Sequence, residues 1–216
     1  MLKHTYATND STTVLSLSGL TGGPGATPLF TNLDFFLPAG VTAVVGDEGQ
    51  GKTSLLRLLA AHLQPTEGQM TLHSPHCQWP VQTTDYQHQV FWCDLSLPGQ
   101  DNDTVQACWD AWRMRYPRFD DALLQQLMPA LSLTEHTHKQ LFMLSTGSRR
   151  KVAIAGALAS GAAVTLLDQP FVSLDAVSIQ EVLNFLQDMS AHPTRAWVVA
   201  DYTAPAGVDL ASLIAL

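Results

Sequence analysis

The stretch Gly46-Asp47-Glu48-Gly49-Gln50-Gly51-Lys52-Thr53 matches the pattern G-x-x-x-x-G-K-[ST], the strongest local signal in this chain of 216 residues. It follows the β-branched run Val41–Val45, which predicts a strand. It precedes a leucine-rich segment, which predicts a helix that begins near Lys52 and stops before Gln64-Pro65. A chance glycine turn would not require this order of strand, loop and helix. We therefore expect a phosphate-binding loop (P-loop) at the start of the helix.

The residue types in this loop suit a polyphosphate. Glycines let backbone N–H groups turn inward around phosphates, and the helix N-terminus adds partial positive charge. We expect Lys52 to reach the β- and γ-phosphates and Thr53 to hold Mg²⁺, whereas Asp47 and Glu48 would weaken binding unless they point into solvent. A dinucleotide site is not expected, because no G-x-G-x-x-G accompanies the strand. The predicted nucleotide-binding residues are Gly46, Asp47, Glu48, Gly49, Gln50, Gly51, Lys52, Thr53 and Ser54.

Outward from the loop, strand and helix patterns alternate along the chain. Before it, strand-like runs at Thr13–Leu17 and Phe35–Leu37 are separated by the turn-rich stretch Gly19–Pro28. After it, Thr104–Leu144 has helical spacing of aromatic residues and leucines. The remaining predicted elements are a helix at Ser148–Ser160, a strand at Val164–Leu167, a helix at Ile179–Met189 and a strand at Trp197–Ala200. This alternation predicts an α/β fold with a mostly parallel sheet covered by helices.

Two further segments carry chemical signals. Asp168 ends the run Val164–Leu167, at the carboxyl end of a predicted buried strand, where open α/β sheets bind their ligands. The alternative reading is a helix-capping aspartate. The segment Leu144–Lys151 is a Ser/Thr/Gly helix start followed at once by three cations, which oppose the helix dipole by about 0.3 to 1 kcal/mol each. This pattern indicates either a docked anion or an exposed basic helix start.

Composition limits the classes of protein that need to be considered. The chain has 46% hydrophobic and 14% charged residues and a net charge of -8, which argues against nucleic acid as the main partner. The start lacks a secretory signal, and the longest apolar stretch falls short of a membrane span, so we expect a cytosolic or peripheral protein. The three cysteines have no metal-ligand or redox spacing. His73, His76, Cys77 and His88 could form a metal site, but their spacing matches no zinc pattern. We therefore expect them to lie on a solvated surface.

Taken together, these motifs resemble the ATP-binding cassette (ABC) family over nearly the whole chain. Gly46–Thr53 resembles its Walker A motif, Leu144–Ser148 its signature motif, Val164–Asp168 its Walker B motif and Ser173–Asp175 its D-loop. The resemblance implies a P-loop NTPase core with a mostly parallel sheet and an antiparallel β segment near the N-terminus. It also implies one nucleotide-binding domain, residues 1–216, with a helical subdomain, residues 95–147, inserted before the signature motif.

The resemblance also implies how the domain works. Two cassettes, identical or different, enclose two ATP molecules with Mg²⁺, each held by the P-loop of one chain and by Ser145 and Gly147 of the other. The implied partner is a transmembrane permease, whose coupling helix would sit in a groove lined by Cys93–Tyr116, which places the chain in the cytoplasm on the inner face of the membrane. Asp168 would be the Walker B aspartate and would ligate Mg²⁺ together with Thr53.

Three positions depart from the family pattern. Gln169 stands where the catalytic glutamate follows the Walker B aspartate, and an amide cannot accept a proton from the attacking water. Asp201 follows the last core strand, where the switch histidine is expected, and His192 lies at the wrong end of that strand to replace it. Asp94 occupies the glutamine-loop position, where it could still ligate Mg²⁺. We therefore predict impaired hydrolysis, unless Asp94 or Asp201 serves as the base.

Three function classes follow. The first is the ATPase subunit of a membrane transporter. The second is a non-hydrolysing, ATP-dependent regulatory or structural switch, suggested by the three altered positions and by the lack of an aromatic residue in Gly19–Pro28 to stack on adenine. The third, a cassette acting on ribosomes or DNA, would need tandem cassettes, coiled coils or a basic surface. The sequence favours the first, and a heteromeric transporter that pairs this chain with a competent one would satisfy the first two.

Overall fold

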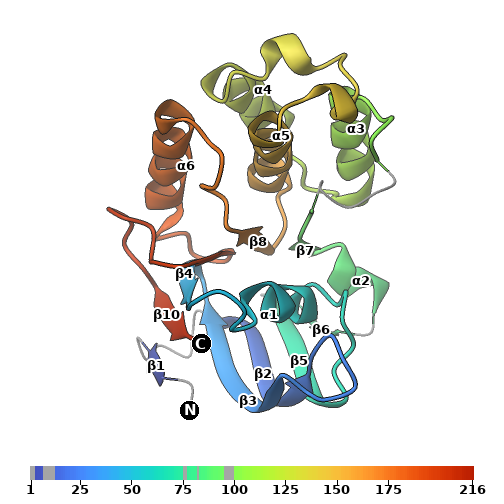
Figure 1. Ribbon diagram of the computed structural model, residues 1–216. Helices are drawn as coiled ribbons and strands as arrows, with labels where there is room; N and C mark the ends of the chain where they lie inside the picture. The colour runs from blue at the N-terminus through green and yellow to red at the C-terminus, as the bar shows by residue number, and fades with distance from the viewer. Residues whose placement is uncertain (1–2, 7–12, 75–76, 82, 95–99) are drawn as a thin grey trace.

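A larger sheet carries the predicted parallel strands. The computed structural model describes residues 3–6, 13–74, 77–81, 83–94 and 100–216. The strands of this sheet are Lys3–Tyr6 (β1), Gly40–Val45 (β4), Val90–Phe91 (β7), Val164–Asp168 (β8), Ala196–Asp201 (β9) and Ser212–Ala215 (β10). Their order is β1-β10-β4-β9-β8-β7, and every neighbouring pair is parallel except β1 with β10 (Figure 1). The predicted mostly parallel sheet is confirmed.

A smaller sheet lies below the first and is antiparallel throughout, in the order β3-β2-β5-β6. Its strands are Thr13–Gly22 (β2), Phe30–Pro38 (β3), Glu67–Ser74 (β5) and Cys77–Pro80 (β6). This confirms the antiparallel segment near the N-terminus. The turn-rich stretch was expected to begin at Gly19, but β2 continues to Gly22, because register shifts after Leu17 and Leu20 let the strand absorb these residues.

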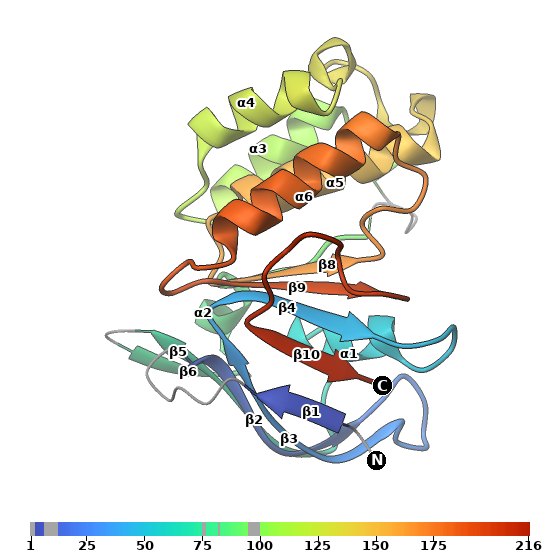
Figure 2. The same ribbon diagram turned by 90° about the vertical axis from the view of Figure 1, so that its left-hand side faces the viewer.

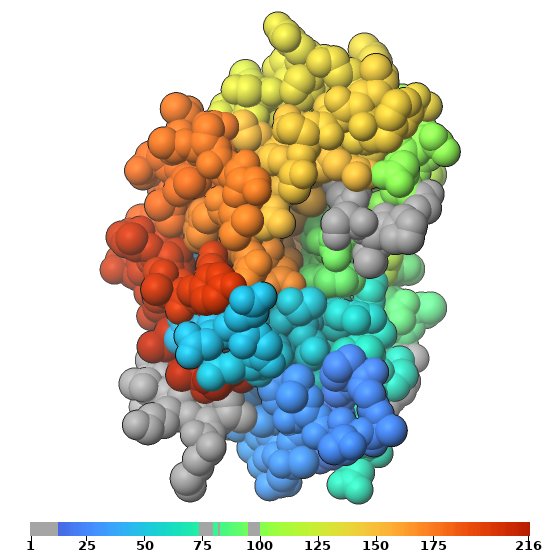
Figure 3. All heavy atoms as spheres, in the orientation of Figure 1, coloured from blue at the N-terminus to red at the C-terminus, as the bar shows by residue number. Residues whose placement is uncertain are grey.

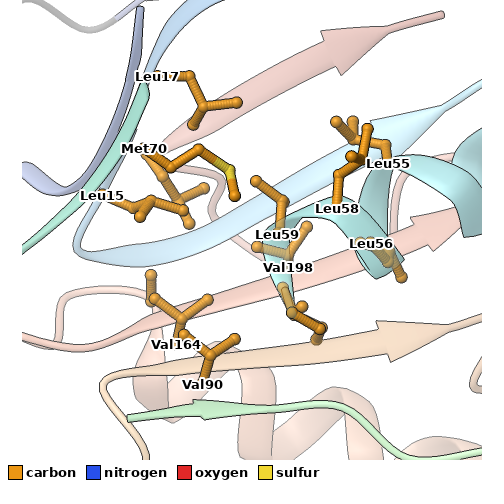
Figure 4. Close-up of a cluster of buried hydrophobic side chains, with 14 of the residues drawn as sticks. Leu15, Leu17, Leu55, Leu56, Leu58, Leu59, Met70, Val90, Val164 and Val198 are labelled. Carbon is orange, nitrogen blue, oxygen red and sulfur yellow. The ribbon is translucent and has the colours of Figure 1, made fainter. Parts of the chain in front are cut away.

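The helix after the P-loop, α1 (Lys52–Leu59), packs between the two sheets (Figure 4). Its leucines share one core with side chains from both sheets. The side chains labelled in that close-up are Leu15, Leu17, Leu55, Leu56, Leu58, Leu59, Met70, Val90, Val164 and Val198. Leu55, Leu56 and Leu58 are fully buried, so each contributes roughly 1.5 to 3 kcal/mol of hydrophobic stabilisation. This burial fixes the start of α1, and with it the P-loop, against the larger sheet.

The other face of the larger sheet is covered by helices (Figure 2). Because side chains alternate along a strand, Val198 and Ala200 of β9 face the α1 side while Trp197 and Val199 face the helical side. The short helix α2 (Thr84–Gln87) lies on the α1 side instead, where Tyr86 joins the core and donates from its hydroxyl to the Leu59 carbonyl at 2.6 Å. The helices on the other face are α3 (Val105–Arg115), α4 (Asp121–Ala130), α5 (Thr146–Ala159) and α6 (Ala176–Met189), with short 3₁₀ turns at Thr134–His136 and Leu141–Met143. Of these, α3 and α4 lie inside the predicted helical subdomain, whose first residues, 95–99, lie outside the described part of the chain.

Candidate nucleotide-binding site

The P-loop connects β4 to α1, and two of its glycines have backbone conformations that other residues avoid. Gly49 has φ 77° and Gly51 has φ 100°. A Cβ on Gly51 would also lie 2.6 Å from Cδ2 of Leu29 and 2.9 Å from Cζ of Phe30. Because Gly51 precedes the first residue of α1, it leaves the first N–H groups of that helix directed into the loop. The loop therefore has the backbone form that a phosphate site requires.

The Lys52 side chain is buried, and its ammonium lies at the loop. Its Nζ donates to the carbonyl oxygens of Gly46 at 2.6 Å and Asp47 at 2.8 Å. The Asp47 N–H donates to Oε1 of Gln50 at 2.6 Å, which closes the loop on the outer side. Asp47 and Glu48 are exposed, so solvent screens their negative charges. Ser54 is half-buried in the first turn of α1.

Three oxygen-bearing side chains meet beside this loop. Asp168, at the end of β8, interacts with the Thr53 side chain, and Asp94, just after β7, is close enough to Asp168 for the two carboxylates to affect one another's charge. Burial raises the pKa of Asp168 and Asp94 raises it further, while Thr53, Arg150 and Lys52 lower it. One or two carboxylates and a hydroxyl are the donor set that Mg²⁺ takes when substrate phosphates complete its coordination. The predicted set of Thr53, Asp168 and Asp94 therefore fits a Mg²⁺–nucleotide.

Both backbone polar groups of Gln169 are hydrogen-bonded. Its N–H donates to the Ala200 carbonyl at 2.8 Å, and its carbonyl accepts from Nη1 of Arg150 on α5. Its φ is 44°, a left-handed value that is uncommon for a residue other than glycine. Gln169, Asp94, Asp168 and Arg150 all line one cavity of about 300 Å³ between α5 and the ends of β7 and β8. The predicted groove segment reaches this cavity through Cys93 and Asp94.

The end of β9 places Asp201 and Tyr202 next to the strand that leads into the P-loop. Asp201 pairs with Val45 in the register of β4 and β9, and its Oδ1 accepts from the Tyr202 N–H at 2.8 Å. The Tyr202 ring lies over the Lys52 ammonium, 4.6 Å from its centroid. His192 lies before the strand, as its place in the sequence indicated, and its ring contacts the Trp197 ring edge to face. Sequence reasoning missed Tyr202; its only signal was an aromatic residue directly after the last core strand.

The signature segment forms the start of α5. Ser145 is the N-cap, and its Oγ accepts from the Ser148 N–H at 3.1 Å. Gly147 lies against the loop after β8, because a Cβ there would lie 2.3 Å from the Ser173 carbonyl oxygen. Both residues are at least partly exposed, and the structure holds a single chain, so their action on a partner's nucleotide stays a prediction.

The three cations that follow have partners inside the chain. Arg149 forms an ion pair with Asp101, Arg150 donates to the Gln169 carbonyl, and Lys151 pairs with Asp175. Carboxylates therefore compensate the charges of Arg149 and Lys151, while Arg150 has a neutral carbonyl acceptor, so a docked anion stays a prediction. The metal site around His73, which the sequence disfavours, involves His76, which lies outside the described residues. Among the described residues there is no group of three or more His, Cys, Asp or Glu side chains that could hold a metal.

The family model for ABC transporters matches residues 30–172, well over half of the chain. The chain belongs to the ABC transporter family. It is an ATP-binding subunit and ATPase of that family. No helix among the described residues is long and apolar enough to cross a membrane.

Named relatives include both exporters and importers. The chain is 29% identical over 209 residues to the cytochrome c biogenesis ATP-binding export protein CcmA of Nitrosococcus oceani, covering 91% of this chain and 88% of the relative. It is 31% identical over 176 residues to the taurine import ATP-binding protein TauB of Pseudomonas entomophila, covering 79% and 66%. A dimeric, post-hydrolysis ATP-binding cassette bound to ADP and Pi shares the fold with a TM-score of 0.71 and 17% identity, covering 88% of each chain.

Proposed function

We propose that this ABC subunit binds Mg²⁺-ATP between two cassettes arranged head to tail and couples binding, with slow hydrolysis, to a transmembrane permease. One observation carries the proposal: the P-loop around Lys52 lies beside the interacting side chains of Thr53 and Asp168. A cation for phosphates and oxygen ligands for a divalent metal thus meet at one place. Relatives named as transport ATP-binding proteins support a transport role over the alternative of a regulatory or structural switch.

Each part of the site has a role in this proposal. The backbone N–H groups of the P-loop, with Ser54, hold the phosphates, and the Lys52 ammonium neutralises charge on the β- and γ-phosphates. Thr53, Asp168 and Asp94 hold Mg²⁺, which supplies charge stabilisation when bound. For this role Asp168 must be ionised, and the neighbouring Arg150 and Lys52 favour that form.

Hydrolysis is slow in this proposal because the residue beside Asp168 is an amide. Gln169 can hydrogen-bond the attacking water but cannot accept its proton, and the lack of a general base typically removes about 10² to 10⁴ in rate. Asp94 lines the same cavity as Gln169, and Asp201 lies at the end of the neighbouring strand. These two carboxylates are the candidates for a weaker, relocated base.

The second cassette completes the site. Ser145 and Gly147 are placed at the exposed start of α5, and in the proposed dimer they contact the nucleotide held by the other copy. The dimeric cassette of similar fold, bound to ADP and Pi, supports this arrangement. The partner cassette is a second copy of this chain or a related one.

The permease would contact the groove lined by Cys93–Tyr116, next to the helical subdomain at residues 95–147, on the cytoplasmic face of the membrane. The relatives named as import and export proteins support a membrane transporter as the partner. No nucleic acid takes part in this proposal, because the chain carries a net charge of -8.

The test compares phosphate release and ATP-dependent dimerisation of the wild type with those of Gln169→Glu. We expect slow release and a long-lived dimer for the wild type, and release roughly 100-fold faster or more for the variant, because a carboxylate restores the base. Gln169→Ala is the matched control and should not accelerate release. Wild-type release as fast as that of Gln169→Glu would contradict slow hydrolysis, and a chain that binds no ATP would contradict the whole proposal.

A further inference from the structure

The Lys52 ammonium has an aromatic neighbour that its family motif does not supply. Two of its contacts are the carbonyl oxygens of Gly46 and Asp47, and on another side it faces the Tyr202 ring at 4.6 Å. A cation this close to the face of a tyrosine ring is attracted by the ring's quadrupole. The contact places Tyr202 beside the one side chain of the P-loop that carries positive charge toward the terminal phosphates.

Tyr202 is also accessible, as a residue that meets a ligand must be. Its residue surface is 48% exposed, although the ring packs on the buried Lys52. Tyr202 directly follows β9, and its N–H donates to Oδ1 of Asp201 at 2.8 Å, which helps to fix its backbone. That bond uses one of the two oxygens of the Asp201 carboxylate. Tyr202, the next residue after β9, places an uncharged side chain with a hydroxyl donor beside the lysine.

We propose that Tyr202 distinguishes ATP from ADP: its hydroxyl donates a hydrogen bond to the terminal phosphate held by Lys52. The inference rests on the proposed function and adds a specificity-determining residue to it. A phenolic hydroxyl donates to a phosphate oxygen without adding negative charge, whereas the Asp201 carboxylate would repel it. ADP lacks the γ-phosphate, so the hydroxyl contributes to binding of the triphosphate alone.

The experiment is an equilibrium titration of Mg²⁺-ATP and Mg²⁺-ADP onto the wild type, Tyr202→Phe and Tyr202→Ala. Tyr202→Phe keeps the ring over the ammonium and removes only the hydroxyl. Because this variant loses one hydrogen bond to a charged group, we expect its affinity for ATP to fall on the order of tenfold and its affinity for ADP to stay within about twofold of the wild type. Phe36→Ala, which removes another half-exposed aromatic side chain (52%) on β3, is the control and should leave both affinities unchanged.

The outcomes separate this inference from the function on which it rests. Equal ATP affinities for the wild type and Tyr202→Phe would overturn the role of Tyr202 while leaving ATP binding in place. Tighter binding of both nucleotides by Tyr202→Ala would also overturn it, because that result would mean that the wild-type ring competes with phosphate for Lys52. If the wild type and Lys52→Met bind neither nucleotide, the proposed function itself fails.

Discussion

At the residue scale, Asp175 combines two interactions that a single substitution can separate. Its Oδ1 accepts the Ser178 N–H at 2.9 Å and caps α6, while Oδ2 pairs with Lys151 on α5. The Lys151 ammonium, with the bonds from Ser178, holds the pKa of Asp175 well below its usual value. Asp175→Asn keeps an N-cap acceptor and removes the charge.

We expect Asp175→Asn to lower the free energy of unfolding at neutral pH. A carboxylate whose pKa is depressed in the folded state stabilises fully above its unfolded pKa of about 3.9 and loses that effect as pH falls toward the folded value. The deficit of the variant should therefore be constant from about pH 5 upward and shrink below that pH. Urea unfolding from pH 2 to 7 measures it. A deficit that stays constant down to pH 2 would show that the charge is not responsible.

Asp188→Asn removes another carboxylate from α6 and serves as the control for that series. Asp188 is exposed on the same helix, so its replacement should have a much smaller effect at every pH. A deficit equal to that of Asp175→Asn would assign the effect to the overall charge of the helix rather than to the pair with Lys151.

The residues that local spacing defines were predictable, and those that depend on tertiary contacts were not. Lys52, Thr53 and Asp168 follow from a motif of fixed spacing and from its place after a strand. The contact of Tyr202 with Lys52 and the bond from Arg150 to Gln169 join segments far apart in the sequence, and no spacing rule relates them. The same limit hid the partners of the three cations at the start of α5, which lie on segments far away in the sequence.

At the element scale, the contact between α3 and α5 depends on one glycine inside a helix. Gly156 lies inside α5, three residues before its last residue, and a glycine in a helix interior costs about 0.8 to 1.0 kcal/mol relative to alanine. A Cβ at this position would lie 2.2 Å from Cε3 and Cζ3 of Trp112 on α3. The absence of a side chain at Gly156 therefore lets the Trp112 indole ring pack against the backbone of α5. This packing offsets the low helix propensity of glycine.

We expect Gly156→Ala to destabilise the chain by about 1 to 3 kcal/mol, because the added methyl group displaces the Trp112 ring from a filled core. Thermal or urea unfolding measures this. In a Trp112→Leu background the same substitution should be neutral or stabilising by up to about 1 kcal/mol, since only helix propensity then remains. Destabilisation of equal size in both backgrounds would contradict the packing argument.

Long periodic elements were predicted well, and short or irregular ones less so. The strands around residues 164–168 and 196–201 and the helices α5 and α6 follow from apolar runs and periodicity. The strand β7 has only two residues, too few for any period to show. The extension of β2 to Gly22 depends on irregular pairing with β3, which the Gly-rich sequence alone does not reveal.

At the scale of the whole molecule, the larger sheet joins two cores that serve different purposes. The core on the α1 side fixes the P-loop, and the core on the helical side fixes α5 and the loop after β8. The fold class was predictable from the alternation of strands and helices. The strand order β1-β10-β4-β9-β8-β7 was not, because tertiary packing determines which strands pair. That order places β9 beside β4, the strand that leads into the P-loop, and β8 beside β9, and so assembles the site.

At this scale we propose that two copies of the chain enclose ATP between Lys52 of one copy and Ser145 of the other. Lys52→Met removes the ammonium and keeps an apolar stem, while Ser145→Asp keeps the N-cap and adds a charge that repels phosphate. A mixture of the two variants can form a dimer with one intact composite site. Sedimentation velocity with Mg²⁺-ATP should show dimers for the wild type and for the mixture, but not for either variant alone. A mixture that stays monomeric while the wild type dimerises, or either variant dimerising alone, would contradict the claim.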